Sequence, residues 1–357
     1  MNTNIFLFLV LSNILFGITI RIPDFLDREE RLREATMSTV KKITNNLYAI
    51  NYYNDYYLEN ILSQGEKNIE QLMKIVINNF GDKYNFDIRR LNSFACSSFN
   101  VKDNENHNLF GRNFDYPSSP TLVVWTRPKN GLKSISFVHG AFFGFSDGGI
   151  PIKDRYLLSP YGPMDGMNEA GVSISVLYLN NPSTHQDNPT LKDITTSIMI
   201  RGVLDNCRNV LDAVSFFKKY NMHDAIQGAS YHFMITDSRG DAVVIEYIDN
   251  KINVIRPDRR YNSDYLFVTN FCLTKLRDRA TCPRYNTMKE YLKVGVKMEI
   301  NDAMNLLNKV RLGSTIWSNV YDTNNLTVTM AYRKDYSKLY EFIIHEPQRV
   351  KIKYMPN

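Results

Sequence analysis

The pattern of apolar and polar positions changes character about a quarter of the way along the 357-residue chain. Before residue 90 the apolar positions follow the i, i+3, i+4 spacing of a helix face, and Gly81 is a natural stop after the clearest stripe. That stripe consists of Ile69, Leu72, Met73, Val76, Ile77 and Phe80. A weaker stripe precedes it between residues 32 and 47. We therefore expect residues 24–90 to be helical.

Beyond Cys96 the pattern becomes that of β-strands. Runs rich in β-branched and aromatic residues, separated by turn residues, cover 121–126, 133–143, 172–178, 230–236, 242–248, 266–270, 327–333 and 339–344. Helical spacing interrupts them at 191–219 and again at 284–310. Strand runs, a pair of helices and further strands predict sheets covered by helices in an α+β arrangement.

An apolar run over residues 5–16, broken only by Ser12 and Asn13, stands at the start of the chain and is followed by Gly17. The run is too short to span a bilayer, and its position predicts a secretory signal peptide over residues 1–17, although no Lys or Arg precedes it. An uncleaved anchor is the alternative. A signal peptide implies that the protein is secreted or lysosomal.

Charge and cysteine content exclude several classes of protein. The net charge of +6 is modest and the basic residues are scattered, so we expect no nucleic-acid partner. The four cysteines do not form a disulfide framework in a chain of this size, and the short spacing of Cys272 and Cys282 leaves one bridge open. Without a C-x-x-C or H-E-x-x-H motif, we expect no metal and no cofactor. The sequon Asn325-Leu326-Thr327 makes Asn325 a candidate glycosylation site.

The strongest candidate chemistry lies at Cys96. A short strand beginning at Cys96 leads into the polar turn 103–106, and the return strand ends in Gly-Arg-Asn-Phe-Asp, which contains Arg112 and Asp115. A hairpin would place both of these side chains beside the sulfur. Because the thiolate is the reactive form and a neighbouring cation lowers the thiol pKa, this arrangement predicts a nucleophilic cysteine.

Three further polar residues lie at the ends of predicted elements. Asn168 is in a Gly-Met-Asn-Glu-Ala-Gly turn before a strand, Asn270 ends the strand 266–270, and Arg284 begins a helix. Such positions often carry binding or catalytic residues. Taken singly, the asparagines are ordinary turn residues, Arg284 is an ordinary solvated helix residue, and Asp115 is an ordinary turn cap. Their combination and order are what make them specific.

This order of motifs resembles the choloylglycine hydrolase group of linear amide C–N hydrolases, which includes bile salt hydrolases and penicillin V acylases. Acid ceramidase and N-acylethanolamine acid amidase are relatives of that group. The resemblance, from Cys96 to about Ile344, implies an N-terminal-nucleophile hydrolase with an αββα sandwich of two stacked antiparallel sheets, preceded by a helical prosegment. It further implies a propeptide or α-subunit over residues 18–95 and a catalytic domain or β-subunit over residues 96–357.

The resemblance also implies a role for each site residue. Cys96 matches the nucleophile, exposed as a new N-terminus by autocleavage after Ala95. An α-amine with a pKa of about 7.7 to 8 would then serve as the base, so no histidine partner is needed. Arg112 and Asp115 match the residues that orient and polarise the sulfur and amine of Cys96. Asn168 and Asn270 match the positions that form the oxyanion hole. Arg284 matches an active-site arginine.

The function implied is hydrolysis of a linear amide in an N-acyl substrate: an N-acyl lipid such as ceramide or N-acylethanolamine, or else a conjugated bile acid or a penicillin-type amide. The long N-terminal piece resembles that of acid ceramidase and N-acylethanolamine acid amidase, and it implies contact with a membrane surface and continued association of the two cleaved chains. The Asn168 turn instead resembles the bile salt and penicillin side, and Ser97 stands where threonine is usual. An acyltransferase and a non-catalytic relative that binds lipid or a partner protein are the alternatives.

Overall fold

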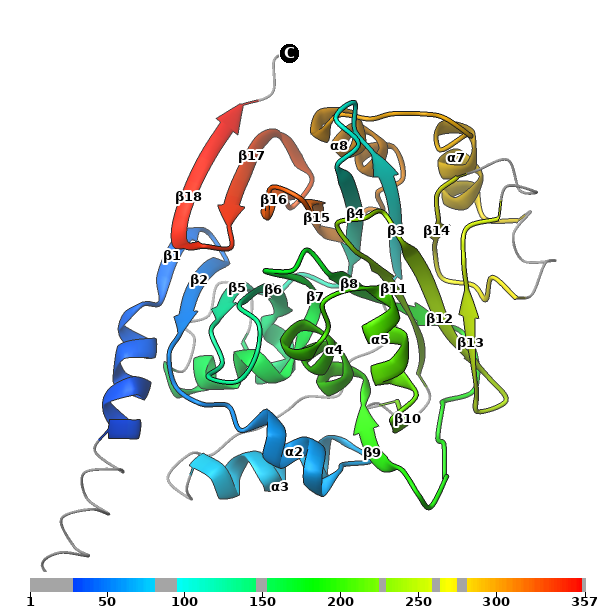
Figure 1. Ribbon diagram of the computed structural model, residues 1–357. Coiled ribbons are helices and arrows are strands. Elements are labelled where there is room, and N and C mark those ends of the chain that lie inside the picture. Colours follow the sequence, from blue (N-terminus) through cyan, green and yellow to red (C-terminus); the bar gives the residue numbers. More distant parts are fainter. Residues whose placement is uncertain are drawn as a thin grey trace, which may run out of the picture.

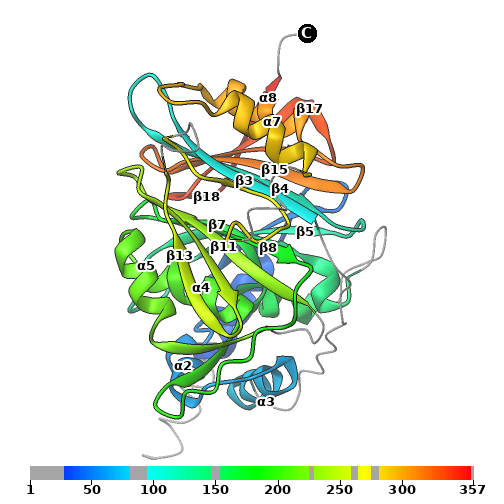
Figure 2. The ribbon, with the colours of Figure 1, turned by 90° about the vertical axis from the view of Figure 1, so that its right-hand side faces the viewer.

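The structure is a computed structural model that describes residues 28–80, 95–145, 153–224, 229–258, 264–274 and 281–354. The predicted signal peptide over residues 1–17 lies outside these ranges. Two β-sheets are stacked face to face, with α4 and α5 on the outer side of one and α7 and α8 on the outer side of the other (Figures 1 and 2). This layering is the αββα sandwich that the sequence predicted.

The first sheet has nine strands in the order β1-β2-β5-β6-β7-β8-β11-β12-β13, and all neighbours are antiparallel except β2 and β5. Its strands are β1 Lys41–Thr44, β2 Leu47–Tyr52, β5 Thr121–Thr126, β6 Ser134–His139, β7 Pro163–Asn168, β8 Ser173–Leu179, β11 Ser230–Thr236, β12 Ala242–Ile248 and β13 Lys251–Ile255. A separate parallel pair joins β9 Lys192–Thr195 to β10 Tyr220–His223.

The second sheet has seven strands, all antiparallel, in the order β14-β3-β4-β15-β16-β17-β18. Its strands are β14 Phe267–Val268, β3 Ala95–Lys102, β4 Asn108–Asp115, β15 Thr315–Asp322, β16 Thr327–Tyr332, β17 Asp335–Ile343 and β18 Glu346–Tyr354. The predicted hairpin of β3 and β4 is therefore confirmed, and it lies inside this sheet between β14 and β15.

The α-helices lie in the predicted regions, and α5 and α8 begin at side-chain caps. The α-helices are α2 Leu58–Gln64, α3 Ile69–Phe80, α4 Thr196–Asn206, α5 Val210–Phe217, α7 Pro283–Tyr291 and α8 Ile300–Lys309, and the 3₁₀-helices are η1 Gly140–Phe143 and η2 Lys153–Tyr161. Glu299 and Asp302 form a capping box that starts α8. Within the described ranges, every helix is too short or too polar to cross a membrane.

The core lies between the two sheets and is rich in aromatic side chains. Trp317 of β15 stacks on Phe114 of β4 with ring centroids 4.2 Å apart. Phe137 of β6, from the other sheet, contacts Phe342 of β17 at 5.9 Å. Rings of this size bury large apolar areas and hold the two sheets in a fixed register, which gives the site a rigid base.

The N-terminal region differs from the helical prediction for residues 24–90. Residues 28–38 and helices α2 and α3 are helical, but residues 41–52 form the hairpin of β1 and β2. Strand β2 pairs in parallel with β5, and its residues Leu47 and Ile50 are fully buried. Burial in a sheet favours the extended form of this apolar segment, because tertiary pairing outweighs weak local spacing. The helical expectation was wrong for residues 41–52.

Candidate active site

The β3–β4 hairpin brings three of the predicted residues together. In its antiparallel register Cys96 lies opposite Phe114, Ala95 opposite Asp115, and Ser98 opposite Arg112. Arg112 is therefore the diagonal neighbour of Cys96, within reach of a long side chain. Cys96 and Arg112 are fully buried, and Asp115 is nearly so.

Asn270 and Arg284 join this group through the backbone of Cys96. The Cys96 N–H donates to Asn270 Oδ1 over 2.8 Å. Arg284 donates from Nη2 to the same oxygen over 2.8 Å, and from Nη1 to the Cys96 carbonyl oxygen over 2.7 Å. Arg284 Nη1 also lies 3.4 Å from Asp115 Oδ2. The structure therefore unites five of the six predicted catalytic residues around one cysteine.

The electrostatics of the group keep the thiol protonated in the uncleaved chain. Burial raises the pKa of Cys96 to about 11, although the charge of Arg112 lowers it, and the charge of Asp115 raises it further. Burial also raises the pKa of Asp115 to about 6, against the lowering effects of Thr315, Arg284 and Arg112. The thiol is thus a weak nucleophile at neutral pH until its surroundings change.

The sixth residue, Asn168, is not part of this group. Its side-chain amide donates to the carbonyl oxygens of Leu204 and Cys207 at the end of α4, over 3.1 and 2.7 Å. Its Oδ1 accepts the N–H groups of Ala170 and Val172, and its own N–H donates to the Val172 carbonyl. The expected oxyanion donor at Asn168 is therefore already used in a turn.

Register on β8 shows how far Asn168 is from the nucleophile. Asn168 caps the turn that leads into β8 at Val172, whereas Asn270 Nδ2 donates to the carbonyl of Tyr178, at the other end of that strand. Six strand residues separate the two ends by about 20 Å. The prediction for Asn168 was wrong, because strand β8 carries the chain away from it.

Sequence reasoning missed Asp165, which holds Arg112. Arg112 Nε lies 3.4 Å from Asp165 Oδ2, and the guanidinium also donates to the Val176 carbonyl over 2.7 Å. Asp165 accepts further hydrogen bonds from Trp317 and Asn319 of β15, each over 2.9 Å. A carboxylate in the middle of an otherwise buried strand was the signal available in the sequence, since such groups need buried donors.

The cysteine and glycosylation predictions have separate outcomes. Cys272 and Cys282 are not joined by a disulfide: Cys272 Sγ accepts a hydrogen bond from Asn181, and Cys282 Sγ lies 3.3 Å from Thr269 Oγ1. The bridge that their spacing left open is therefore not formed. Asn325 is exposed in the turn between β15 and β16, which is compatible with glycosylation, and this remains a prediction.

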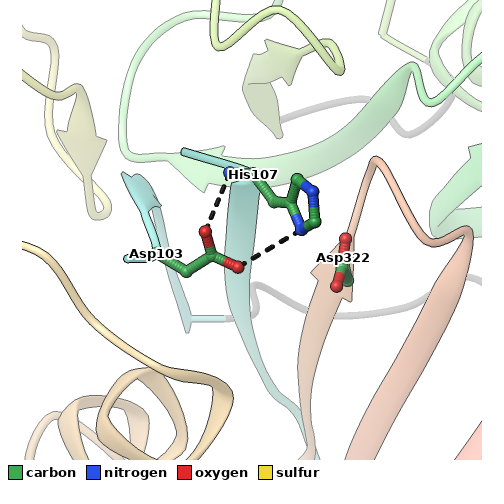
Figure 3. A group of neighbouring side chains, drawn as sticks. All are labelled: Asp103, His107 and Asp322. Atoms are coloured by element: carbon green, nitrogen blue, oxygen red, sulfur yellow. Dashed lines mark hydrogen bonds and ion pairs between the residues drawn. The ribbon is translucent and has the colours of Figure 1, made fainter. Parts of the chain in front are cut away.

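One further side-chain cluster lies at the far end of the hairpin from Cys96. Asp103, His107 and Asp322 offer nitrogen and oxygen atoms within 4.8 Å of one another (Figure 3). Asp103 Oδ1 accepts two backbone N–H groups of its own turn. Asp322 Oδ1 accepts those of Asn324 and Asn325. The cluster therefore stabilises two neighbouring turns.

The fold and the site define a class: an αββα sandwich with a buried cysteine whose own backbone is held by two side chains. The family described as linear amide C–N hydrolases, choloylglycine hydrolase family, matches residues 96–269, beginning at Cys96 itself. This match covers just under half of the chain and agrees with the motifs read from its sequence, so the chain is similar to this family.

Individual relatives are more distant. A penicillin V acylase from Pectobacterium atrosepticum is 26% identical over 182 residues, which cover 47% of this chain and 48% of the acylase. The alignment thus spans about half of that relative. Two solved variants of conjugated bile acid hydrolase from Clostridium perfringens have TM-scores of 0.51 and 0.50 at 13% and 16% identity, each covering 73% of this chain and 97% of its own. At such identities the likeness establishes the fold.

Proposed function

We propose that the protein is the precursor of a cysteine amidase that cleaves its own Ala95–Cys96 bond and then hydrolyses linear amides of N-acyl compounds. The observation that carries this proposal is a pair of hydrogen bonds to the backbone of Cys96: its N–H donates to Asn270 Oδ1, and its carbonyl oxygen accepts from Arg284. A cysteine that acts only through its sulfur needs no side chain on its own nitrogen. A cysteine whose nitrogen becomes a catalytic amine does.

Self-cleavage supplies the base that the uncleaved site lacks. Cys96 Sγ attacks the Ala95 carbonyl carbon, the C–N bond breaks, and the thiol proton passes to the Cys96 nitrogen. Water then opens the thioester to give an Ala95 carboxylate and a free thiol. The new α-amine, with an ordinary pKa of about 7.7 to 8, can accept the proton of the neighbouring thiol.

The same residues would serve amide hydrolysis. Sγ attacks the substrate carbonyl, the amine leaves with a proton, and water releases the acyl group from the thioester. Asn270 accepts from Cys96 N through Oδ1 over 2.8 Å, and its Nδ2 donates one N–H to the Tyr178 carbonyl over 2.8 Å. The second N–H of Nδ2 is the candidate donor to the oxyanion. In other enzymes one such donor contributes about 3 to 4 kcal/mol to the transition state.

Contacts on the N-terminal side support continued association of the two fragments after cleavage. Strand β2 is paired along its length with β5. The Tyr56 hydroxyl donates to Asp205 over 2.5 Å, and the Thr195 N–H donates to the buried Glu66 carboxylate over 2.7 Å. Loss of the fragment would expose a strand edge and leave buried polar groups unpaired, which is costly.

The relatives and the N-terminal segment together support our choice of substrate class. Penicillin V and conjugated bile acids are the amides named for the relatives. N-acylethanolamines and ceramides are the lipid amides to which the long N-terminal segment points. We rank the lipid amides first and the penicillin or bile-salt amides second. A predicted secretory route would deliver the precursor outside the cytosol or to the lysosome.

The decisive test is N-terminal sequencing and intact mass of the precursor before and after incubation at about pH 4.5, below the pKa of about 6 of Asp115. We expect a fragment that begins Cys96-Ser97-Ser98 and amidase activity that appears with it. Cys96→Ala should stay intact and lose at least about 10⁴-fold in kcat, as nucleophile removal does elsewhere. Cys207→Ala, at a buried thiol beside α4, is the matched control and should be processed normally.

Two outcomes would reject the proposal: an intact wild-type chain, or a Cys96→Ala variant that is still processed and active. Product analysis with a competing amine separates hydrolysis from acyl transfer, because transfer would yield a new amide.

A further inference from the structure

We propose that His232 and Glu246 form a buried ion pair that positions Asn270 against Cys96. The two residues are thus positioning residues for the proposed amidase, and their catalytic meaning rests on that proposed function. His232 lies on β11 and Glu246 on the neighbouring β12, and both side chains are fully buried. Asn270 belongs to the segment that follows β14 of the other sheet.

The pair holds this segment on both sides of Asn270. His232 Nε2 lies 2.8 Å from the carbonyl oxygen of Thr269, the residue before Asn270. Glu246 Oε1 accepts the N–H of Leu273 over 2.6 Å, and Oε2 accepts the Thr274 hydroxyl over 3.0 Å. Three residues of a loop are thereby fixed to two adjacent strands of a rigid sheet.

The hydrogen bonds assign the charge state of the pair. His232 Nδ1 lies 3.2 Å from Glu246 Oε1, while Nε2 faces the Thr269 carbonyl, so both ring nitrogens face acceptors. Only the doubly protonated ring donates at both ends. Burial by itself raises the pKa of Glu246, but the hydrogen bond and charge of His232, with the N–H groups of Leu273 and Thr274, bring it below its usual value. A buried cation therefore faces a buried anion, and each is satisfied.

The segment held by this pair carries the amide on which the site depends. Asn270 Oδ1 accepts from both Cys96 N and Arg284 Nη2. A displacement of about 1 Å at such a group typically costs about 10²-fold in rate. The side-chain hydrogen bonds that the described residues show for His232 and Glu246 go to each other and to residues 269–274, so the effect of these side chains on Cys96 passes through Asn270.

The test compares Glu246→Gln with Glu246→Ala. Glutamine keeps an oxygen that can accept from His232 and Leu273, whereas alanine removes both acceptors. We expect kcat to fall about 100-fold in Glu246→Ala and about 10-fold in Glu246→Gln, with KM within about threefold of wild type. In a Cys96→Ala background, which cannot self-cleave, the amides of Leu273 and Thr274 should exchange hydrogen faster in both variants.

His223→Gln is the matched control, because it also breaks a histidine–carboxylate pair: His223 Nε2 lies 2.8 Å from Asp193 Oδ1. It should leave kcat within about twofold of wild type. Thr274→Val, which removes one donor to Glu246, is a milder variant that serves if the Glu246 variants do not fold, and it should lower kcat by about threefold.

Several outcomes would overturn the inference. One is unchanged exchange at residues 273 and 274 in the altered chains, and another is an unchanged kcat despite faster exchange. A third is an equal loss of kcat in His223→Gln, which would indicate general destabilisation. If the wild-type chain neither self-cleaves nor hydrolyses amides, the proposed function fails, and the exchange data alone decide whether the pair holds the Asn270 segment.

Discussion

Asn168 and Asn270 are two asparagines at strand ends that look equivalent in the sequence and differ completely in the structure. Asn270 directs its Oδ1 at the nitrogen of Cys96 and at Arg284. Asn168 uses its amide on carbonyls at the end of α4 and its Oδ1 on its own turn. The same side chain thus serves the reacting residue in one place and the scaffold in the other.

The difference shows that the role of such an asparagine is decided by the hydrogen-bond partners that surround its side chain, and not by the sequence motif in which it stands. An asparagine side chain offers two N–H donors and an acceptor oxygen, and it forms hydrogen bonds with the complementary groups that the fold places within reach. At residue 168 those groups are supplied within the turn and by α4. At residue 270 they are supplied by a hairpin and a helix that are distant in the sequence.

The sharpest test of the comparison is Asn270→Ala. Loss of the amide removes the acceptor for Cys96 N and the candidate oxyanion donor, so kcat should fall about 10²- to 10³-fold. The free energy of unfolding should change by less than about 2 kcal/mol, because only part of the Asn270 side chain is buried. Steady-state kinetics and thermal unfolding check both. An active Asn270→Ala enzyme would remove Asn270 from the mechanism.

A smaller effect is expected from pH on the rate of self-cleavage at Cys96, the residue that Asn270 contacts. The thiol of Cys96, with a pKa of about 11, stays protonated from acid to neutral pH, whereas Asp115 titrates near 6. Ionised Asp115 opposes negative charge on the sulfur, and neutral Asp115 does not. The thiolate fraction falls tenfold for each pH unit below the thiol pKa, so self-cleavage should slow as the pH is lowered. Protonation of Asp115 through about pH 6 should offset this fall by about tenfold between pH 7 and pH 5, which appears as an inflection in the rate profile.

Gel analysis of cleavage rates across this range is the measurement. In Asp115→Asn the residue is neutral at every pH, so the inflection should disappear. A flat wild-type profile, or an inflection that survives in Asp115→Asn, would show that another group governs the reaction.

The smallest expected effect on activity is that of Asn168→Ala. The substitution leaves two buried carbonyls and two N–H groups without their partner, so the free energy of unfolding should fall by about 2 to 4 kcal/mol. Amidase activity of the folded fraction should stay within about twofold of wild type, because Asn168 lies about 20 Å along β8 from the Asn270 contact. A large loss of kcat at unchanged stability would reverse the comparison.

Local pattern predicted much of the fold. Strands β5, β11 and β12 have the bounds expected from their apolar runs, and the polar turn at 103–106 closes the β3–β4 hairpin as expected. These elements depend on residues within a few positions of one another. Strand β15 was missed because its apolar residues do not alternate regularly with polar ones: Ser318 and Asn319 stand side by side in its middle, and they form hydrogen bonds with residues of other strands.

The site residues likewise fall into those that depend on local sequence and those that depend on distant contacts. The sequence by itself determined the nucleophile candidate and its near neighbours, because Cys96, Arg112 and Asp115 belong to one hairpin whose register a short turn sets. Only the tertiary structure decided that Asn270 and Arg284 meet the backbone of Cys96, that Asn168 does not, and that Asp165 and the His232–Glu246 pair stand behind them. The physical reason is that hydrogen-bond partners across a sandwich depend on how two sheets stack, and a linear pattern does not record stacking.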